Sequence, residues 1–181
     1  MYKSNNINKL LQAFEDNEIW DAMPESKLEQ VFRKLAIPAF KDFISMLPDE
    51  LKTIGDGNID EEIAPLIHIL NLLGIKTIAC CSGHGKILPN ILMSIINMDD
   101  FNNIHCVLTD FSGGTLVEYF QDKFILRTIE QGIRIDIDCS EAQLNEYAAW
   151  LFFLVCRDYF LQLHWKWKTD RIILFLMEIS K

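Results

Sequence analysis

The strongest constraint on the fold is a strict alternation of isoleucine with polar residues from Ile133 to Asp138. In an extended chain, successive side chains point to opposite faces, so the isoleucines face a core. Arg134, Asp136 and Asp138 then face outward or into a cleft. This segment therefore predicts a strand in a sheet that is buried on one side.

A long helix is predicted directly after that strand. Ser140 and Gln143 form a capping-box pattern at the start of residues 141–160, whose apolar face is too wide to be exposed. Helical apolar spacing also marks three earlier stretches: residues 8–23 and 39–47, which stop at Pro24 and Pro48, and residues 26–37, which Pro38 is expected to end or kink. These patterns predict an α+β fold, with N-terminal helices followed by a mixed or antiparallel sheet and a long helix packed on it.

The two parts meet at a turn-forming cluster, Ile54–Asn58, which combines two glycines with Asp and Asn. We therefore expect a helical N-terminal region at residues 1–53 and an α+β core at residues 54–181. A chain of 181 residues is rather short for two domains, so both regions are expected to form one structural domain.

A helix, a glycine, a short strand and a loop follow one another after this turn. Residues 60–73 carry apolar residues at helical spacing, begin with three acidic residues and end at Gly74, a C-terminal cap. Residues 75–80 are β-branched or small, which fits a strand. Further strands are expected at residues 87–96, 104–111, 116–119, 124–129, 163–168 and 172–179.

The loop Ser82–Lys86 concentrates reactive side chains directly after two cysteines, Cys80 and Cys81. The glycines on either side of His84 allow positive φ and a close approach of the backbone to a ligand. Successive amides in such a turn can bind an anion, and the lysine places a positive charge beside them. We therefore expect a small anionic ligand here, a nucleotide or a nucleotide-derived signal.

The predicted ligand-binding residues are Cys80, Ser82, Gly83, His84, Gly85, Lys86 and Arg134. Arg134 is included because its strand would carry it toward the anion, although Asp136 on the same strand face offers it an ion pair instead. If the ligand is turned over, His84 is the candidate general acid or base. Cys81 is then the candidate nucleophile, because an adjacent imidazolium lowers the pKa of a thiol.

Two other interpretations of the loop remain open. Cys81 and His84 have the two-residue gap of a metal knuckle, and His105 with Cys106 would complete a four-ligand zinc set. Alternatively, the cysteines are small buried hydrophobic residues and the glycines only turn the chain. The sequence suggests no cofactor other than zinc.

The formal charge of −9 limits the classes of partner. Phosphate contacts need clustered Lys and Arg, so a broad nucleic-acid-binding surface is not expected. The same acidic surface suits a second hypothesis, an interaction protein that imitates nucleic acid and inhibits a host factor. A second copy of the chain and a host protein are both candidate partners.

The cysteines and the apolar runs indicate a compartment. Five cysteines without the regular spacing of a disulfide framework favour a reducing environment. The first residues lack a secretory-signal pattern. The longest apolar run, Ala148–Cys156, is well short of the ~20 residues that cross a bilayer. We therefore expect a cytoplasmic protein with no membrane segment.

Residues 59–96 resemble known proteins. Thr77 and the run Cys80–Gly85 are similar to a Thr-x-x-Cys-Cys-Ser-Gly-His segment of small, mostly uncharacterised phage and bacterial proteins. The segment is more distantly similar to the tRNA wybutosine-synthesis methyltransferase family, which has Arg where this chain has His84. The first resemblance implies a protein of a phage or mobile element with no defined activity. The second implies a shared fold.

Overall fold

The computed structural model describes residues 4–16, 25–48, 59–94, 124–130 and 132–160. The chain divides into two compact units, a helical unit of residues 1–47 and 148–181 and a sheet unit of residues 48–147. The domain boundary predicted between residues 53 and 54 lies outside the described residues, so it stays a prediction.

Helix α1 (Asn5–Glu15) opens the helical unit. Ser4 caps it, because the serine hydroxyl accepts a hydrogen bond from the Ile7 amide at 3.1 Å. The same hydroxyl donates to a carboxylate oxygen of Asp42 at 2.6 Å. Ile7 and Phe14 lie on the buried side of the helix, so the amphipathic pattern of the sequence sets its orientation.

A continuous helical stretch follows in three parts: α2 (Glu25–Val31), the π-helical segment η2 (Phe32–Ala36) and α3 (Ile37–Met46). Of the two outcomes predicted at Pro38, a helix end is not observed, because Pro38 lies in the first turn of α3 and the helix is locally distorted before it. Proline has no N–H, and its ring clashes with the carbonyl four residues before it. The wider π-helical turn just before Pro38 accommodates both effects.

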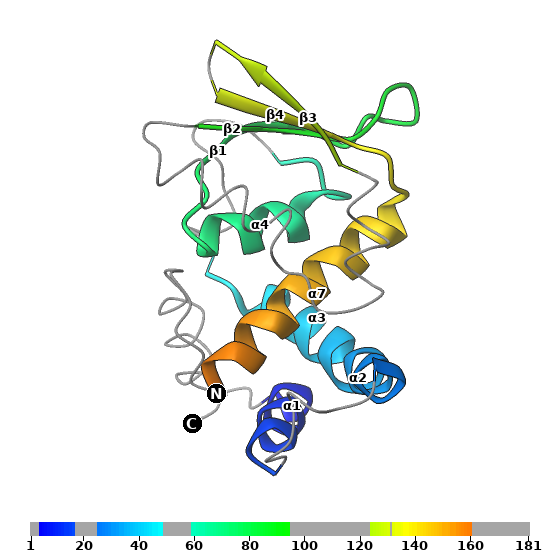
Figure 1. Ribbon diagram of the computed structural model, residues 1–181, viewed down its shortest axis with the longest axis vertical. Helices are drawn as coiled ribbons and strands as arrows, with labels where there is room; N and C mark the ends of the chain where they lie inside the picture. Colours follow the sequence, from blue (N-terminus) through cyan, green and yellow to red (C-terminus); the bar gives the residue numbers. More distant parts are fainter. Residues whose placement is uncertain (1–3, 17–24, 49–58, 95–123, 131, 161–181) are drawn as a thin grey trace. The chain divides into compact units, whose positions relative to one another are not determined.

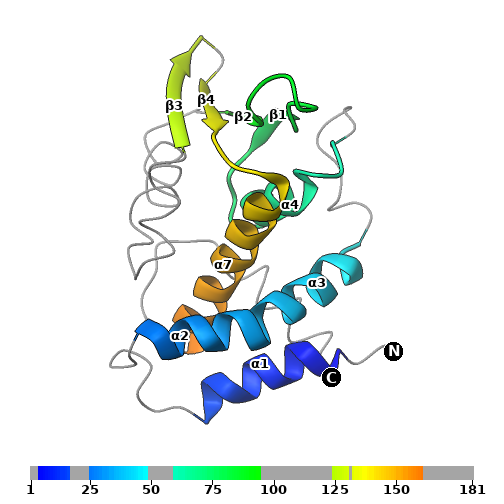
Figure 2. The ribbon, with the colours of Figure 1, turned by 90° about the vertical axis from the view of Figure 1, so that its right-hand side faces the viewer.

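The core of the helical unit is aromatic. Helix α7 (Glu141–Phe160) contributes its larger part to this unit. The ring centroids of Phe32 and Trp150 lie 5.0 Å apart in an edge-to-face arrangement, and those of Phe43 and Phe152 lie 4.8 Å apart. Figures 1 and 2 both show α1 alongside α3 in this unit. Within the described part of the chain, no helix is both long enough and apolar enough to cross a membrane.

The sheet unit contains, among the described residues, a four-stranded antiparallel sheet in the order β1-β2-β4-β3. The strands are β1 (Thr77–Cys81), β2 (Asn90–Met93), β3 (Phe124–Ile129) and β4 (Gly132–Ile137). This confirms the predicted α+β fold class, in its antiparallel form.

Strand β1 contains a β-bulge. Thr77 pairs with Met93 and Ala79 pairs with Leu92, so Ile78 is one extra residue on this strand. The side chain of Ile78 is 42% exposed. The bulge therefore sets the register of the cysteines that end the strand.

Strand β4 is the predicted alternating strand, and its three isoleucines are buried. The ion pair predicted between Arg134 and Asp136 is present, and the Asp136 side chain is only 7% exposed. It lies on the face opposite the isoleucines, where Arg127 and Arg134 both form ion pairs with it. The carboxylate is covered by its own partners.

Helix α4 (Ala64–Leu72) lies against one face of the sheet in both ribbon views (Figures 1 and 2). It is shorter than the predicted helix of residues 60–73, because Asp60 lies before a turn that precedes the helix; the Asp60 backbone carbonyl accepts the Ile63 and Ala64 amides, each at 3.1 Å. Gly74 ends the helix with a φ of 83°, as predicted. The Ile75 amide completes this cap by donating to the Leu70 carbonyl at 3.0 Å.

Several other sequence predictions can be compared with the structure. The capping box is confirmed, since the Ser140 amide donates to the Gln143 side chain at 2.8 Å and the reciprocal bond measures 3.4 Å. The strand predicted at 124–129 is β3. The strand predicted at 87–96 begins only at Asn90, directly after Pro89. The strands predicted at 104–111, 116–119, 163–168 and 172–179 lie outside the described residues.

Candidate functional site

The loop after β1 has an unusual backbone. Gly83, His84 and Gly85 have consecutive positive φ angles of 81°, 46° and 69°. Among the described residues, His84 alone combines a side chain with a positive φ, a conformation that costs energy for any residue with a Cβ. The Gly83 carbonyl closes the turn by accepting the Lys86 and Ile87 amides at 2.9 and 3.2 Å. The loop therefore holds the histidine in one strained orientation.

The carboxylate of Asp60 meets this loop from the turn before α4. Its Oδ2 accepts a hydrogen bond from the Ser82 amide at 2.7 Å. This bond lowers the pKa of the Asp60 carboxyl below its ordinary value, and the nearby His84 acts in the same direction against partial desolvation. Asp60 is therefore ionised at neutral pH and presents a negative charge to the loop.

The imidazole of His84 is held through both of its nitrogens. Nε2 lies 3.4 Å from Oδ2 of Asp60, and Nδ1 lies 3.3 Å from the Ser82 hydroxyl oxygen. The His84 side chain is nevertheless 62% exposed, whereas that of Asp60 is 27% exposed. The ring is thus oriented by the protein while it stays accessible to a ligand.

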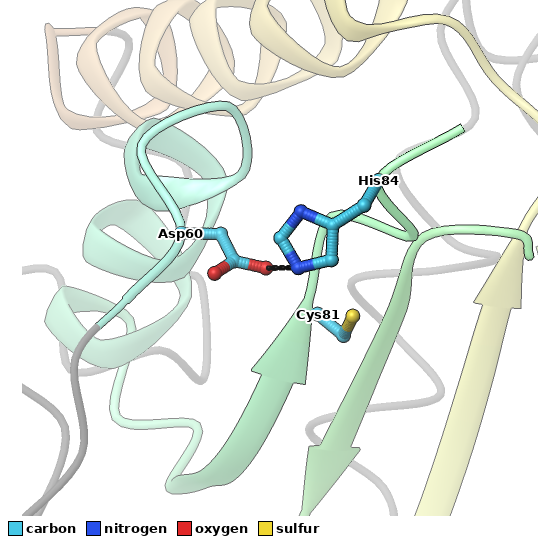
Figure 3. A group of neighbouring side chains, drawn as sticks. All are labelled: Asp60, Cys81 and His84. Atoms are coloured by element: carbon cyan, nitrogen blue, oxygen red, sulfur yellow. Dashed lines mark ion pairs between the residues drawn. The ribbon is translucent and has the colours of Figure 1, made fainter. Parts of the chain in front are cut away.

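The two cysteines have different environments. Sγ of Cys81 accepts a hydrogen bond from the Gly83 amide at 3.3 Å. Cys81, Asp60 and His84 offer ligand atoms that all lie within 4.8 Å of one another, and Figure 3 shows the three side chains converging. We call these three residues the Asp60 cluster. Partial burial raises the pKa of the Cys80 thiol, so Cys80 ionises less readily than an ordinary cysteine.

The amides of the loop are only partly available to a ligand. The Ser82 amide donates to Asp60 and the Gly83 amide donates to Cys81. Two of the amides predicted to bind an anion therefore already have partners within the protein. An anionic ligand would instead meet the side chains of His84 and Lys86.

A pocket of about 710 Å³ lies beside the loop. It is bounded by the turn before α4, by the loop and the segment leading to β2, and by the start of α7. The lining residues are Glu62, Ser82, His84, Gly85, Lys86, Ile87, Leu88, Pro89, Cys139, Ser140, Glu141 and Leu144. The pocket is large enough for a small organic ligand.

The remaining predicted site residues lie apart from this pocket or outside the described chain. Arg134 is on β4, where its Nε donates to Oδ1 of Asp136 at 2.8 Å, and it does not line the pocket. Arg127 binds the other oxygen of the same carboxylate at 3.0 Å. Asp136, Arg127 and Arg134 form the Asp136 cluster. His105 and Cys106, of the predicted zinc set, lie outside the described residues.

The sequence interpretation treated Asp60 only as an acidic residue near a helix start. A signal for its role was present in the segment lengths. The nine residues of α4 span about 14 Å at 1.5 Å per residue. The five residues of β1 span about 16 Å in the returning direction. Because the two lengths are similar, the start of α4 and the end of β1 lie at the same end of the unit, and Asp60 lies beside Ser82.

Comparisons of the chain with protein-family models, curated proteins and solved structures found no match. The features of this chain that indicate a function are the Asp60 cluster and the pocket beside it.

Proposed function

We propose that the protein binds a small anionic ligand of the nucleotide class in the pocket beside the loop. The observation that carries this proposal is the mixed lining of the pocket. His84 and Lys86 lie on one wall, exposed apolar side chains follow them in the chain, and two carboxylates also contribute. Such a lining suits a ligand with an anionic end and a larger, hydrogen-bonding end.

The anionic end is assigned to Lys86 and His84. An exposed ammonium group binds a phosphate as a point charge, and the His84 imidazole donates a hydrogen bond to it when Nδ1 exchanges its 3.3 Å contact with the Ser82 hydroxyl for the ligand. The start of α7 adds its partial positive charge on another wall of the pocket, where Ser140 and Glu141 contribute. These groups bind the anion in place of the Ser82 and Gly83 amides, which already donate hydrogen bonds within the protein.

The other end of the ligand is assigned to the apolar and acidic parts of the lining. Ile87 is 59% exposed and Leu88 is also exposed. Their apolar surface can pack against the nucleobase of a nucleotide ligand. Glu62 and Glu141 can accept hydrogen bonds from sugar hydroxyls or amino groups. A bare inorganic anion would leave these parts without a partner.

We place this binding in the cytoplasm, and in a protein of the phage or mobile-element type, as parts of the same proposal. Cys80 and Cys81 are free thiols, which suits a reducing compartment. The Cys-Cys-Ser-Gly-His run that resembles phage and bacterial proteins is the same segment that forms the Asp60 cluster and the pocket wall. These two parts of the proposal rest on the thiols and on that resemblance.

The proposal is tested by a thermal-shift panel of nucleoside monophosphates, cyclic nucleotides, the matching nucleosides and inorganic phosphate. A ligand at a hundred times its Kd adds about 2.7 kcal/mol to the free energy of unfolding, so it raises the Tm. Lys86→Ala should weaken binding by about 1.5–3 kcal/mol, because it removes a charge-assisted hydrogen bond. Isothermal titration of the best probe gives the Kd of each variant.

Lys76→Ala is the matched control, because Lys76 is an exposed lysine of the same unit that does not line the pocket. It should leave the Kd of the best probe unchanged. Nucleosides that bind as well as the nucleotides would contradict the anionic assignment. A full panel without any shift would contradict the proposal and leave the inhibitor hypothesis as its replacement.

A further inference from the structure

We propose that Asp60, Cys81 and His84 form a binding site for one divalent metal ion of the zinc type, with one coordination position left for a water molecule or a ligand. The three residues supply an oxygen, a sulfur and a nitrogen within 4.8 Å of one another. This donor set suits zinc and its neighbours rather than calcium or magnesium, which prefer oxygen alone.

The distances agree with tetrahedral coordination. Bond lengths of zinc to nitrogen and oxygen place two such ligand atoms about 3.4 Å apart. Nε2 of His84 lies 3.4 Å from Oδ2 of Asp60. A sulfur ligand would lie about 3.6 Å from each of them, so Cys81 needs a side-chain movement of at most about 1 Å.

Each ligand residue also has a supporting hydrogen bond from the loop. The Ser82 amide donates to Asp60, and the Gly83 amide donates to the sulfur of Cys81. The Ser82 hydroxyl contacts Nδ1 of His84 and leaves Nε2 directed at Asp60. Such outer contacts orient metal ligands and fix the histidine tautomer in known metal sites. The loop therefore preorganises all three ligands.

The charges of the site fit a divalent ion. Asp60 is a carboxylate at neutral pH, and a metal ion deprotonates a coordinating thiol. One carboxylate, one thiolate and a neutral imidazole then balance a charge of +2. The strained positive φ of His84 is also explained, because it directs the ring toward Asp60 rather than into solvent.

Three protein ligands are typical of catalytic zinc sites, whereas structural sites have four. Ser82 and His84 line the pocket, so the metal would lie at its wall with the fourth position open. This inference does not depend on the proposed nucleotide ligand. Metal binding is measured without any ligand, and ligand binding is measured both in chelator and with zinc, so the two proposals succeed or fail separately.

The test uses the full chain stripped with a chelator and titrated with Co²⁺ and Zn²⁺. We expect one ion per chain, and a Co²⁺ spectrum with thiolate charge transfer in the near ultraviolet and intense visible bands of a tetrahedral site. Cys81→Ser should lose the charge-transfer band. Asp60→Asn and His84→Ala should each weaken zinc affinity by more than tenfold, and Ser82→Ala by about tenfold.

Cys80→Ser is the matched control, since it changes the adjacent thiol that lies outside the cluster. It should keep the band and the zinc affinity. A wild-type protein without a charge-transfer band overturns the proposal. A Cys80→Ser variant that loses the band and the zinc affinity as fully as Cys81→Ser also overturns it. Loss in Cys106→Ser combined with unchanged affinity in Asp60→Asn would overturn it in favour of the four-ligand set. The wild-type spectrum shows whether a thiolate metal site exists even if a variant fails to fold, and the Cys80→Ser, Cys106→Ser and Asp60→Asn variants identify its ligands.

Discussion

The sheet unit contains two aspartates in polar clusters, and their surroundings differ in kind. Asp136 is almost fully covered and bound by the guanidinium groups of Arg127 and Arg134. Asp60 is more exposed and is bound by a backbone amide and by the imidazole of His84. The first carboxylate is neutralised by permanent charges, and the second by groups that can exchange protons or ligands.

The difference teaches how to separate a structural ion pair from a reactive site. Both Asp136 oxygens are paired with arginines that stay charged at any working pH, so this carboxylate is neutralised within the protein. The Asp60 cluster combines a carboxylate, a thiol and a solvent-exposed imidazole, each able to bind a metal or a proton. Side-chain ion pairs hold the Asp136 cluster together, whereas backbone amides of the glycine loop position the residues of the Asp60 cluster.

The largest expected effect comes from Gly83→Ala, which breaks the backbone that builds the Asp60 cluster. A Cβ at Gly83 would overlap the carbonyl oxygen of Ile87, and φ is positive there. Strain and overlap together cost about 3 kcal/mol. We expect metal and ligand affinity to fall sharply, as measured by titration, with the Asp136 cluster unaffected.

Gly85→Ala is the matched control, because φ is also positive at Gly85 but a Cβ there meets no atom within 4 Å. It should cost only about 1 kcal/mol in urea unfolding. Equal losses in the two variants would show that overlap with Ile87 plays no part.

The second largest effect is expected for Asp136→Ala. Removing this carboxylate leaves two guanidinium groups side by side without their shared acceptor, which should lower the free energy of unfolding by about 2 kcal/mol. Urea denaturation measures the loss. The Co²⁺ spectrum and the nucleotide Kd should stay the same, and a change in either would mean that the two clusters are coupled.

A smaller effect is expected for Arg127→Ala. The Arg127 side chain is largely exposed, so its ion pair should contribute only about 0.5 kcal/mol. Arg134→Ala provides the comparison, since Arg134 binds the other oxygen of Asp136 and is less exposed. If Arg127→Ala costs as much as Asp136→Ala in urea unfolding, the cluster is not the shared arrangement described above.

The smallest effect concerns pH. The Ser82 amide lowers the pKa of Asp60 in the folded protein. The resulting stability is fully present above the unfolded aspartate pKa of about 3.9, and it is lost as the pH falls through the lower folded value. Asp60→Asn should therefore lose less stability than the wild type between pH ~5 and ~3 in urea titrations. If the wild type and Asp60→Asn lose equal stability over this pH range, the hydrogen bond from the Ser82 amide does not stabilise the ionised Asp60 carboxylate.

Local patterns predicted several features of the sheet unit: strands β3 and β4, the helix end at Gly74 and the capping box at Ser140. Gly74 and the capping box at Ser140 depend on neighbours in sequence, so their chemistry is visible in the chain itself. Pro38 shows the limit of that approach, because a π-helical turn absorbed a break that local rules require. The position of the loop was predicted, but its partner Asp60 lies 22 residues from Ser82 and is brought there by tertiary structure.

The burial of Asp136 was missed for a related reason. Alternation predicts which face a side chain points to, but the cover on that face comes from Arg127 on a different strand. Register between strands depends on turns and bulges that a single strand pattern does not contain. The Asp136 cluster therefore depends on the pairing of strands β3 and β4.

The bulge at Ile78 shifts by one residue the strand pairing of Cys80 and Cys81 with β2. With it, Cys81 is paired with Asn90, whose other neighbour across the sheet is Asp136. If Ile78 instead paired regularly with Leu92, every later residue of β1 would shift by one partner, and Cys80 rather than Cys81 would lie opposite Asn90. A single inserted residue in an edge strand thus selects which of two adjacent cysteines is presented to Asp60 and His84.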